Sequence, residues 1–298
     1  MSNWNLLWWG IGYVLGFVGI TVGLIKWRVA GRKERQPFRS GDRLLRGPGE
    51  SLWQGIAELD ENLVYVLLAA LVTPLVGGGA LVLLTAQLSK AWVLPGLGAS
   101  LLAILLAMIL GANWIVGQLE KRWRYYLGYF GERYVAEHLD PLKAEGFRVF
   151  HDVPCGEADS PFNVDHVVVG PTGVWAIETK TRRKGRARPG FKDAEVVFDG
   201  TQLIFPWAED RHGLDQALQR ALWLEKWLER LLGKGVAVQP VLTFPGWFVV
   251  ERAPGPVRVL NPKLIPAAIR GRGEAVLTPP QVDLLARQLD QRCRNVEF

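Results

Sequence analysis

The stretch Asn163–Lys180, NVDHVVVGPTGVWAIETK, predicts a β-hairpin with acidic side chains on one face. Two runs rich in Val, Ile and Trp flank the turn at Gly170–Gly173, where Pro presets φ and Gly accepts positive φ. A symmetric tight turn sets an antiparallel register in which Asp165 lies opposite Glu178. Because side chains alternate along a strand, Asp165, Glu178 and Lys180 then share one face.

Two carboxylates directly opposite each other repel, so this arrangement requires a compensating cation. A divalent metal ion is the cation that we expect. The alternative is a solvent-facing strand on which Glu178 and Lys180 pair with neighbours at little gain in stability. We favour the metal site because the polar groups converge on an otherwise strongly apolar hairpin.

The composition indicates one sizeable domain together with membrane segments. Hydrophobic residues make up 49% of the 298 residues, and the mean hydropathy of +0.11 is high for a purely soluble protein. The net charge of +6 is divided about equally between residues 1–118 and 119–298, so it is weak evidence for nucleic-acid binding. Cys155 and Cys293 match neither a metal-ligand spacing nor a disulfide framework, which favours a reducing compartment.

Three uncharged runs predict membrane-spanning helices, at 6–25, 63–88 and 91–116. Each is long enough to cross a hydrocarbon core of ~30 Å. The first run lacks a basic n-region before it and a small-residue cleavage site after it, and Lys26, Trp27 and Arg28 follow it directly, so we favour an uncleaved helix over a signal peptide. The spans contain no ionisable side chains, which disfavours a transport function. The expected order is a first transmembrane helix at 1–26, a basic cytoplasmic loop at 27–62 and a helical hairpin at 63–118.

The charges flanking these runs predict the orientation. The segment Lys26–Arg46 carries eight Lys or Arg residues against two acidic ones, whereas the hairpin tip at Ser89–Lys90 carries one Lys. By the positive-inside rule, the basic segment is cytoplasmic. We therefore expect a multi-pass protein of the cell (inner) membrane, with the N-terminus and the tip outside and residues 119–298 in the cytoplasm.

Residues 119–298 carry alternating strand and helix patterns. We expect helices at 127–139, 214–232 and 278–294, strands at 147–153, 164–170, 174–181, 236–244 and 257–260, and a hairpin around Asp199-Gly200. This order predicts an α/β or α+β domain with a central mixed sheet.

Three motifs in this region match a known family. They are the helix start Gly131-Glu132, the strand FNVDHVVVG at Phe162–Gly170 and the segment AIETK at Ala176–Lys180. Over about residues 127–250 the chain resembles the nuclease-related domain (NERD) family, which is similar to the PD-(D/E)xK nuclease superfamily. The resemblance implies a restriction-endonuclease-like core in which a mixed sheet is flanked by helices. The chain departs from the superfamily pattern because Val164, not proline, precedes Asp165.

The resemblance also implies residue roles. Asp165 and Glu178 would bind Mg²⁺, Lys180 would position or activate the attacking water, and Glu132 would complete the site. Mg²⁺ prefers hard oxygen ligands and keeps several waters, so these two carboxylates and the Thr179 carbonyl are a sufficient protein contribution, and Mn²⁺ is a substitute. A glutamine frequent in the family matches Gln216, for which we expect a supporting role.

Other polar and aromatic residues have less specific expectations. A basic loop could contact phosphates beside the site, or could be a solvated or lipid-facing loop; its residues are Arg182, Arg183, Lys184, Arg186 and Arg188. His166 falls on the face opposite Asp165, as expected for a core histidine. Trp223 and Trp227, four residues apart on a helix, favour core packing over base stacking.

Two functions follow from these patterns. The first is a membrane-tethered, Mg²⁺-dependent endonuclease that hydrolyses phosphodiester bonds of cytosolic nucleic acid, with DNA favoured over RNA. The second is a catalytically inactive nucleic-acid-binding or signalling module held at the bilayer. Both predict nucleic-acid binding, and only the first predicts metal-dependent cleavage that needs Asp165 and Lys180.

Overall fold

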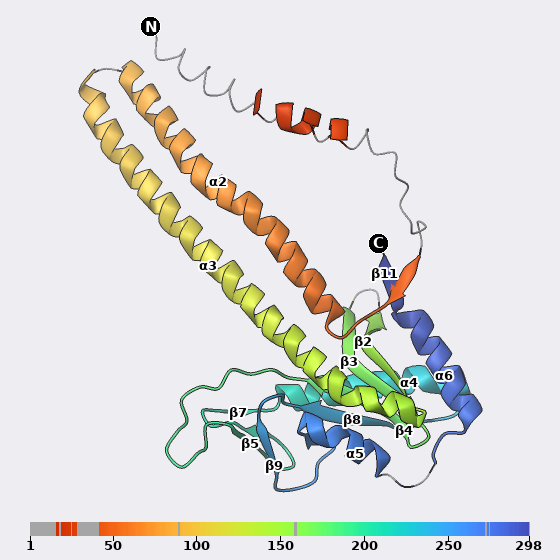
Figure 1. Ribbon diagram of the computed structural model, residues 1–298. Coiled ribbons are helices and arrows are strands. Elements are labelled where there is room, and N and C mark those ends of the chain that lie inside the picture. Colours follow the sequence, from red (N-terminus) through yellow and green to blue (C-terminus); the bar gives the residue numbers. More distant parts are fainter. Residues whose placement is uncertain are drawn as a thin grey trace. The chain divides into compact units, whose positions relative to one another are not determined.

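The computed structural model describes residues 16–17, 19–24, 26–28, 42–88, 90–157, 160–271, 273 and 275–297 (Figure 1). Most of the first predicted span and of the basic segment that follows it lies outside the described residues. The chain divides into two compact units, which are treated separately below. One contains residues 63–116, and the other contains residues 43–62 and 117–297.

The first unit contains two long helical stretches. They belong to helix α2 (Glu50–Leu88) and helix α3 (Val93–Leu139), which are joined through the 3-10 turn η1 (Lys90–Trp92). Small residues bring the two stretches close together. Ser100 Oγ donates a hydrogen bond to the Gly78 carbonyl at 2.9 Å, and a Cβ at Gly78 would lie 2.9 Å from that same Oγ. Glycine there permits the close approach of the two helices.

One helix in the described part of the chain is long and apolar enough to cross a membrane, and it begins at Val93. This finding agrees with the predicted span at 91–116. Within the predicted span at 63–88 the chain is helical, but the apolar run reaches only from Val76 to Thr85. The structure thus supports one of the three predicted membrane helices, by length and composition.

The second unit is a mixed α/β domain. Its remaining strands are β1 (Arg43–Leu45), β2 (Arg148–Glu157), β3 (Ser160–Gly170), β4 (Gly173–Thr179), β5 (Glu195–Phe198), β6 (Leu203–Ile204), β7 (Glu209–Asp210), β8 (Val238–Thr243), β9 (Phe248–Glu251), β10 (Arg258–Leu260) and β11 (Arg294–Glu297). Its helices, besides the ends of α2 and α3, are η2 (Asp140–Glu145), α4 (His212–Leu232), η3 (Pro262–Leu264), α5 (Ile265–Arg270) and α6 (Pro279–Cys293).

The central sheet has the strand order β10-β8-β4-β3-β2. Strands β2, β3 and β4 form an antiparallel meander, whereas β4, β8 and β10 run parallel to one another. The parallel step from β4 to β8 includes helix α4, as a crossover connection requires. A smaller sheet, β7-β6-β5-β9, and the pair β1-β11 complete the unit. The predicted mixed sheet flanked by helices is therefore present.

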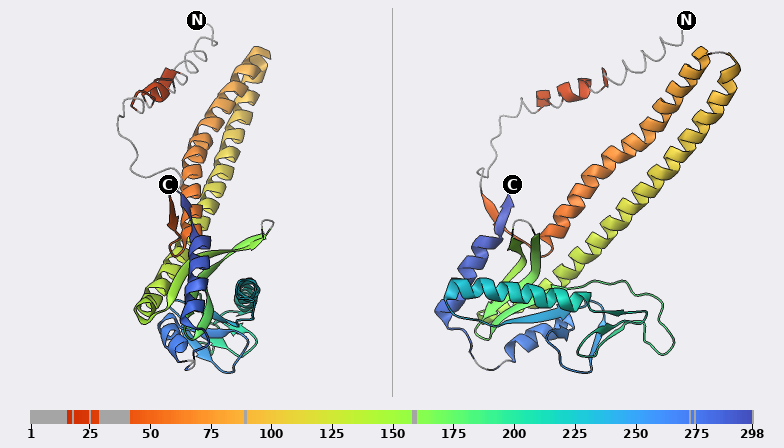
Figure 2. Two further views of the ribbon diagram at one scale, coloured as in Figure 1. Left: turned by 90° about the vertical axis from the view of Figure 1, so that its right-hand side faces the viewer. Right: turned by 180° about the vertical axis from the view of Figure 1, so that it is seen from behind.

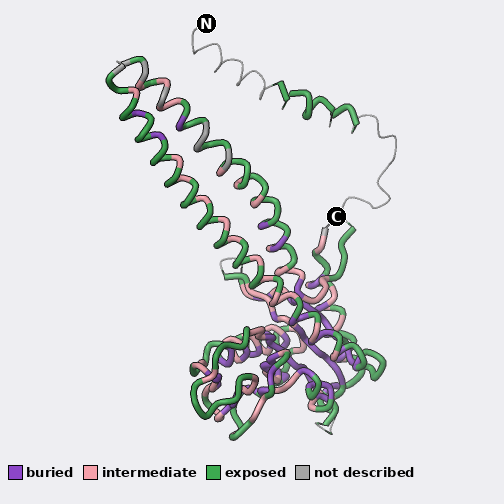
Figure 3. Tube along the Cα trace, turned by 60° about the vertical axis from the view of Figure 1, so that its left-hand side comes forward, coloured by how far each residue is buried: buried purple, intermediate pink, exposed green. Residues whose placement is uncertain are grey.

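Alternating side chains of the central sheet face two different cores. Val167 and Val169 belong to the core covered by α4 and α6, whereas Val168 belongs to the core covered by the end of α3 and by α5. Figure 2 shows α4 and α6 against the sheet, and Figure 3 shows that buried residues concentrate in its strands. Trp223 and Trp227 pack against the first of these cores, as their helical spacing predicts.

The predicted loop at 27–62 is wrong over its last part, where α2 already begins at Glu50. The first turns of α2 pack against the C-terminal half of α3, which stabilises their helical conformation. A Cβ at Gly55 would lie 2.7 Å from the Tyr125 ring, and Arg122 Nε donates to Asp60 at 2.6 Å. The sequence of this segment is polar and carries no long apolar run, so its packing is not evident from hydropathy.

Candidate active site

The hairpin forms with the predicted register. The ladder pairs Gly170 with Gly173 and continues to His166 paired with Ile177. Asp165 and Glu178 are the next residues on their strands. Asp165 Oδ2 accepts a hydrogen bond from the Thr179 backbone N–H at 2.7 Å, which ties the middle of β3 to the end of β4.

The two carboxylates converge with two cations. Lys180 Nζ lies 2.7 Å from Glu178 Oε1. Arg220, which comes from α4, lies between the carboxylates: its Nη1 is 3.4 Å from Asp165 Oδ1 and donates a hydrogen bond to Glu178 Oε2. The Glu178 side chain is 2% exposed and that of Asp165 is 13% exposed, so these charges interact largely out of water.

Glu132 approaches the same site from helix α3. Its neighbour Gly131 packs against the end of β4, because any Cβ there would overlap the Thr181 Cγ2 methyl. The Glu132 side chain is buried, and burial together with the nearby charges of Asp165 and Asp152 raises its pKa to about 9. A backbone hydrogen bond from Gly49 opposes that rise. Glu132 therefore keeps its proton at neutral pH unless a cation joins the cluster.

The protonation of the other site residues follows from the same burial. Burial raises the pKa of Asp165, although Arg220 and the Thr179 N–H oppose the rise. Burial lowers the pKa of Lys180, and the charges of Asp165 and Glu132 oppose that change. A lysine with a lowered pKa gives up its proton more readily, which suits a group that positions or deprotonates a water.

Several oxygens in this region are buried and accept no hydrogen bond: Glu178 Oε1, Thr179 Oγ1 and Gln216 Oε1. The contact of Glu178 Oε1 with Lys180 is close, yet it lacks the geometry of a hydrogen bond. Hard oxygen atoms without donors suit Mg²⁺, which needs few protein ligands. In the described residues, however, no three acidic, His or Cys side chains are grouped as a metal site. The donor chemistry thus fits Mg²⁺, while Arg220 lies between the two carboxylates that would hold it.

The sequence did not indicate Arg220 or Asp152. Arg220 follows Gln216 by one helical turn, and this spacing on one face of α4 was the only available signal. Asp152 is buried in β2 and has a positive φ of 47°, a conformation that Asp tolerates better than most residues. It accepts hydrogen bonds from Arg46 Nε at 3.0 Å and from Asn163 Nδ2 at 2.8 Å.

The basic loop after Lys180 is only partly free to contact a ligand. Arg182 pairs with Asp210, its guanidinium carbon lies 4.5 Å from the centre of the Phe205 ring, and its carbonyl accepts a hydrogen bond from Trp247 Nε1. Arg188 donates to the Pro206 carbonyl at 3.3 Å. The remaining residues of the loop that were predicted to contact nucleic acid, Arg183, Lys184 and Arg186, are exposed.

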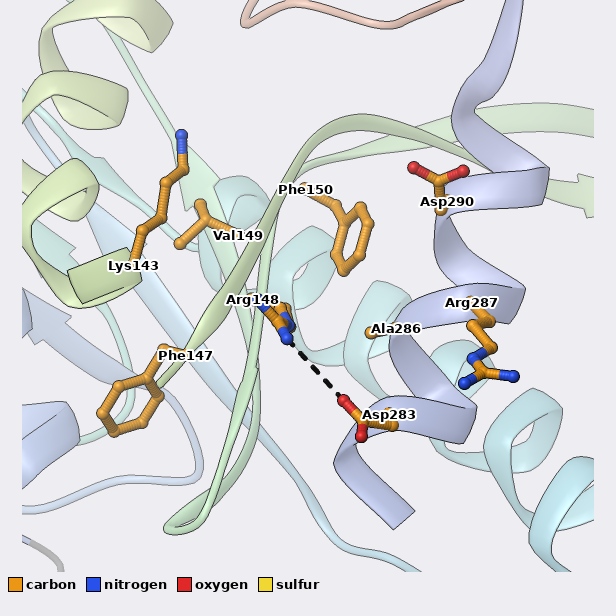
Figure 4. A pocket seen from close by; sticks show the side chains of 9 residues that line it. All are labelled: Lys143, Phe147, Arg148, Val149, Phe150, Asp283, Ala286, Arg287 and Asp290. Atoms are coloured by element: carbon orange, nitrogen blue, oxygen red, sulfur yellow. Dashed lines mark ion pairs between the residues drawn. The ribbon is translucent and has the colours of Figure 1, made fainter. Parts of the chain in front are cut away.

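None of these residues lines the cavity of about 630 Å³ that Figure 4 shows. It is lined by residues of η2, β2 and α6, with Arg148 and Asp283 forming an ion pair across it at 3.7 Å. A second cavity of about 490 Å³ is closer to the site, because Thr181 and Arg183 line it together with α3. The volume of a cavity therefore does not identify the candidate active site, whereas the cluster of charged groups does.

His151 and His166 belong to the buried core and not to the cluster of charged groups. His166 is fully buried, and its Nδ1 lies 2.9 Å from His151 Nδ1 across the β2–β3 pair. Burial lowers the pKa of His151 to about 4 and lowers that of His166 further. Both rings are neutral at physiological pH, as expected for the face opposite Asp165.

The mixed α/β domain, with two carboxylates and a lysine gathered beside the β3–β4 hairpin, is consistent with a nuclease-like fold. Residues 127–245 match the family model of NERD, the nuclease-related domain. The resemblance is confirmed, and the chain carries a nuclease-related domain over that range. A search of curated proteins and a search of solved structures each returned no match.

Proposed function

We propose that this protein is a membrane-anchored, Mg²⁺-dependent endonuclease that hydrolyses phosphodiester bonds of cytosolic nucleic acid, with DNA favoured over RNA. The observation that carries the proposal is the convergence of Asp165, Glu178 and Lys180 at the end of β4, inside a nuclease-related domain.

Each residue has a role that its surroundings support. Asp165 and Glu178, with the Thr179 carbonyl, would hold Mg²⁺, which neutralises phosphate charge and stabilises the leaving oxygen. Lys180 is largely buried beside Glu178, so its amine is held where it can orient the attacking water. Glu132 adds a third carboxyl from α3, and Gln216 offers an amide oxygen without a donor. Arg183, Lys184 and Arg186 are exposed cations for the phosphate backbone.

The membrane anchor is the second part of the proposal. Several features support three spans with the nuclease domain in the cytoplasm. They are the apolar helix that begins at Val93, the uncharged runs at 6–25 and 63–88, and the basic residues of Lys26–Arg46. Glu120–Tyr126, charged and aromatic, suits the inner interface.

The alternative is a catalytically inactive nucleic-acid-binding or signalling module. Arg220 and Lys180 favour it, because these two cations already balance Asp165 and Glu178 without a metal ion. Both functions predict binding of nucleic acid, so only turnover separates them.

The deciding experiment is an incubation of the purified full chain, in detergent or nanodiscs, with plasmid DNA, linear DNA, single-stranded DNA and RNA. Reactions contain Mg²⁺, Mn²⁺ or EDTA. We expect cleavage of DNA with either metal, none in EDTA, and a loss of about 100-fold or more in rate for Asp165→Ala and Lys180→Ala.

Glu137→Gln and Lys234→Ala are the matched controls, since both change exposed residues of the same type outside the cluster. They should cleave like the unmodified chain. Binding of nucleic acid, measured by fluorescence anisotropy, without cleavage of any substrate in either metal would instead establish the inactive module.

A further inference from the structure

Arg220 stands out because a charged residue occupies the sheet-facing side of α4. The helix residues around it, Ala217, Ala221 and Leu224, are buried in apolar cores. The Arg220 side chain is itself only 19% exposed. A guanidinium buried to this extent needs charged partners, and the two it has are Asp165 and Glu178.

The contacts distinguish Arg220 from Lys180. Lys180 reaches one carboxylate, through Glu178 Oε1. Arg220 reaches both, and its hydrogen bond to Glu178 uses Oε2, the oxygen that Lys180 leaves free. Two carboxylates and two cations then balance one another within the chain. A divalent ion that binds here adds positive charge to a cluster that is already neutral, unless Lys180 or Arg220 moves away.

We propose that Arg220 is an exchangeable counter-cation: it holds Asp165 and Glu178 together when no divalent ion is bound, and it competes with a divalent ion for their oxygens. This inference rests on the proposed function, because it assumes that the carboxylates are metal ligands. It assigns Arg220 a positioning role that the family resemblance did not supply.

Competition has two consequences of opposite sign. Replacing Arg220 with a neutral side chain leaves two buried carboxylates without their shared partner, which destabilises the metal-free protein. The same replacement removes the competitor, so a divalent ion binds more tightly. An arginine that merely supported the site would weaken both stability and metal binding.

The test uses the full chain with Arg220→Met, which replaces the apolar stem of the side chain and removes the charge. Isothermal titration calorimetry with Mn²⁺, in the absence of nucleic acid, measures metal affinity. Thermal unfolding in EDTA and in saturating Mg²⁺ measures stability. We expect Mn²⁺ affinity to rise by about tenfold, the Tm in EDTA to fall, and the Tm difference between Mg²⁺ and EDTA to exceed that of the unmodified chain.

Arg211→Met is the matched control, because Arg211 precedes the same helix and pairs with Asp215 at an exposed position, at 3.8 Å. It should change neither readout. If Arg220→Met does not fold, Arg220→Lys replaces it. A lysine keeps the charge but lacks the planar guanidinium, whose Nη1 contacts both carboxylates, and we expect a Mn²⁺ affinity between those of the unmodified chain and Arg220→Met.

The outcomes separate the inference from the proposed function. If the unmodified chain binds Mn²⁺ and the Arg220 variants bind it equally or more weakly, Arg220 is not a competitor, while the metal site stands. If neither the unmodified chain nor any Arg220 variant binds Mn²⁺ or Mg²⁺, the metal site itself is wrong and the inference is overturned with it. Metal binding by Arg220→Met alone would support the competition in its strongest form.

Discussion

Glu132 is neutral at physiological pH because it is buried beside other carboxyl groups. Its ordinary pKa is 4.5, and burial with the charges of Asp165 and Asp152 raises it to about 9. Between these two values the folded chain keeps a proton that the unfolded chain releases. The folded state is therefore stabilised at low pH, and that contribution is lost as pH rises towards about 9.

Glu132→Gln should make stability less dependent on pH, since the amide is neutral throughout. In EDTA, the free energy of unfolding of the unmodified chain should fall by up to about 1.4 kcal/mol per pH unit between about pH 5 and 9, and the variant should show a shallower slope. Urea titrations over this range measure both. Glu137→Gln, an exposed change on the same helix, should keep the original slope. Equal slopes for the unmodified chain and Glu132→Gln would contradict the assignment of this proton.

Gly131 allows α3 to approach the end of β4, one residue before Glu132. Gly131→Ala gains about 1 kcal/mol of helix propensity, but its Cβ would overlap the Thr181 methyl. We expect a net loss of about 1–3 kcal/mol from overpacking. Thr181→Ser removes that methyl and should restore most of the loss. A double-mutant cycle by denaturant unfolding checks the pair, and additive effects would show that the close approach is not the cause.

The segment before α2 is part of the second unit, although it precedes the matched family region by a long stretch of chain. Asp152 accepts hydrogen bonds from Arg46 and from the Ser51 N–H and Oγ, the last two at 2.7 Å. The Arg46 N–H donates to the Cys293 carbonyl, and β1 pairs with β11. Since Asp152 influences the pKa of Glu132, this segment borders the site.

Arg46→Met should therefore destabilise the second unit strongly. The pair with Asp152 is buried, with side chains 10% and 5% exposed, and removal of one partner typically costs about 3–5 kcal/mol. Arg122→Met is the matched control, because its pair with Asp60 is 37% and 46% exposed and should contribute less than about 1 kcal/mol. Thermal and urea unfolding give both values. Similar small losses for the two variants would mean that the Arg46 pair does not anchor the segment.

At the scale of the whole molecule, the charge distribution predicts the direction of insertion. Alkaline phosphatase inserted at Ser89–Lys90 should be active, which reports an external tip, and green fluorescent protein fused after residue 298 should fluoresce, which reports a cytoplasmic end. Changing the basic residues of Lys26–Arg46 to neutral ones should weaken or invert this pattern. Phosphatase activity at the C-terminus and none at the tip of the unmodified chain would contradict the proposed topology.

The sequence was sufficient for features that depend on neighbouring residues. The turn at Gly170–Gly173 and the alternation of side chains specify the register, and so place Asp165 and Glu178 directly after the last paired residues of the β3–β4 ladder. The helix start at Thr278, where Gln281 Oε1 accepts from the Thr278 N–H at 3.0 Å, is equally local. These elements form where the patterns predict them.

Only the tertiary structure could reveal the partners of the carboxylates. Arg220 is separated from Asp165 by 55 residues, and Arg46 is separated from Asp152 by 106. Such contacts depend on how α4 and the segment before α2 pack against the sheet. The hydrophobic periodicity of the sequence does not predict that packing. The hairpin alone indicated that its two carboxylates need a cation. The chain itself supplies one such cation, because the face of α4 that covers the sheet carries Arg220 to Asp165 in the middle of β3 and to Glu178 near the end of β4.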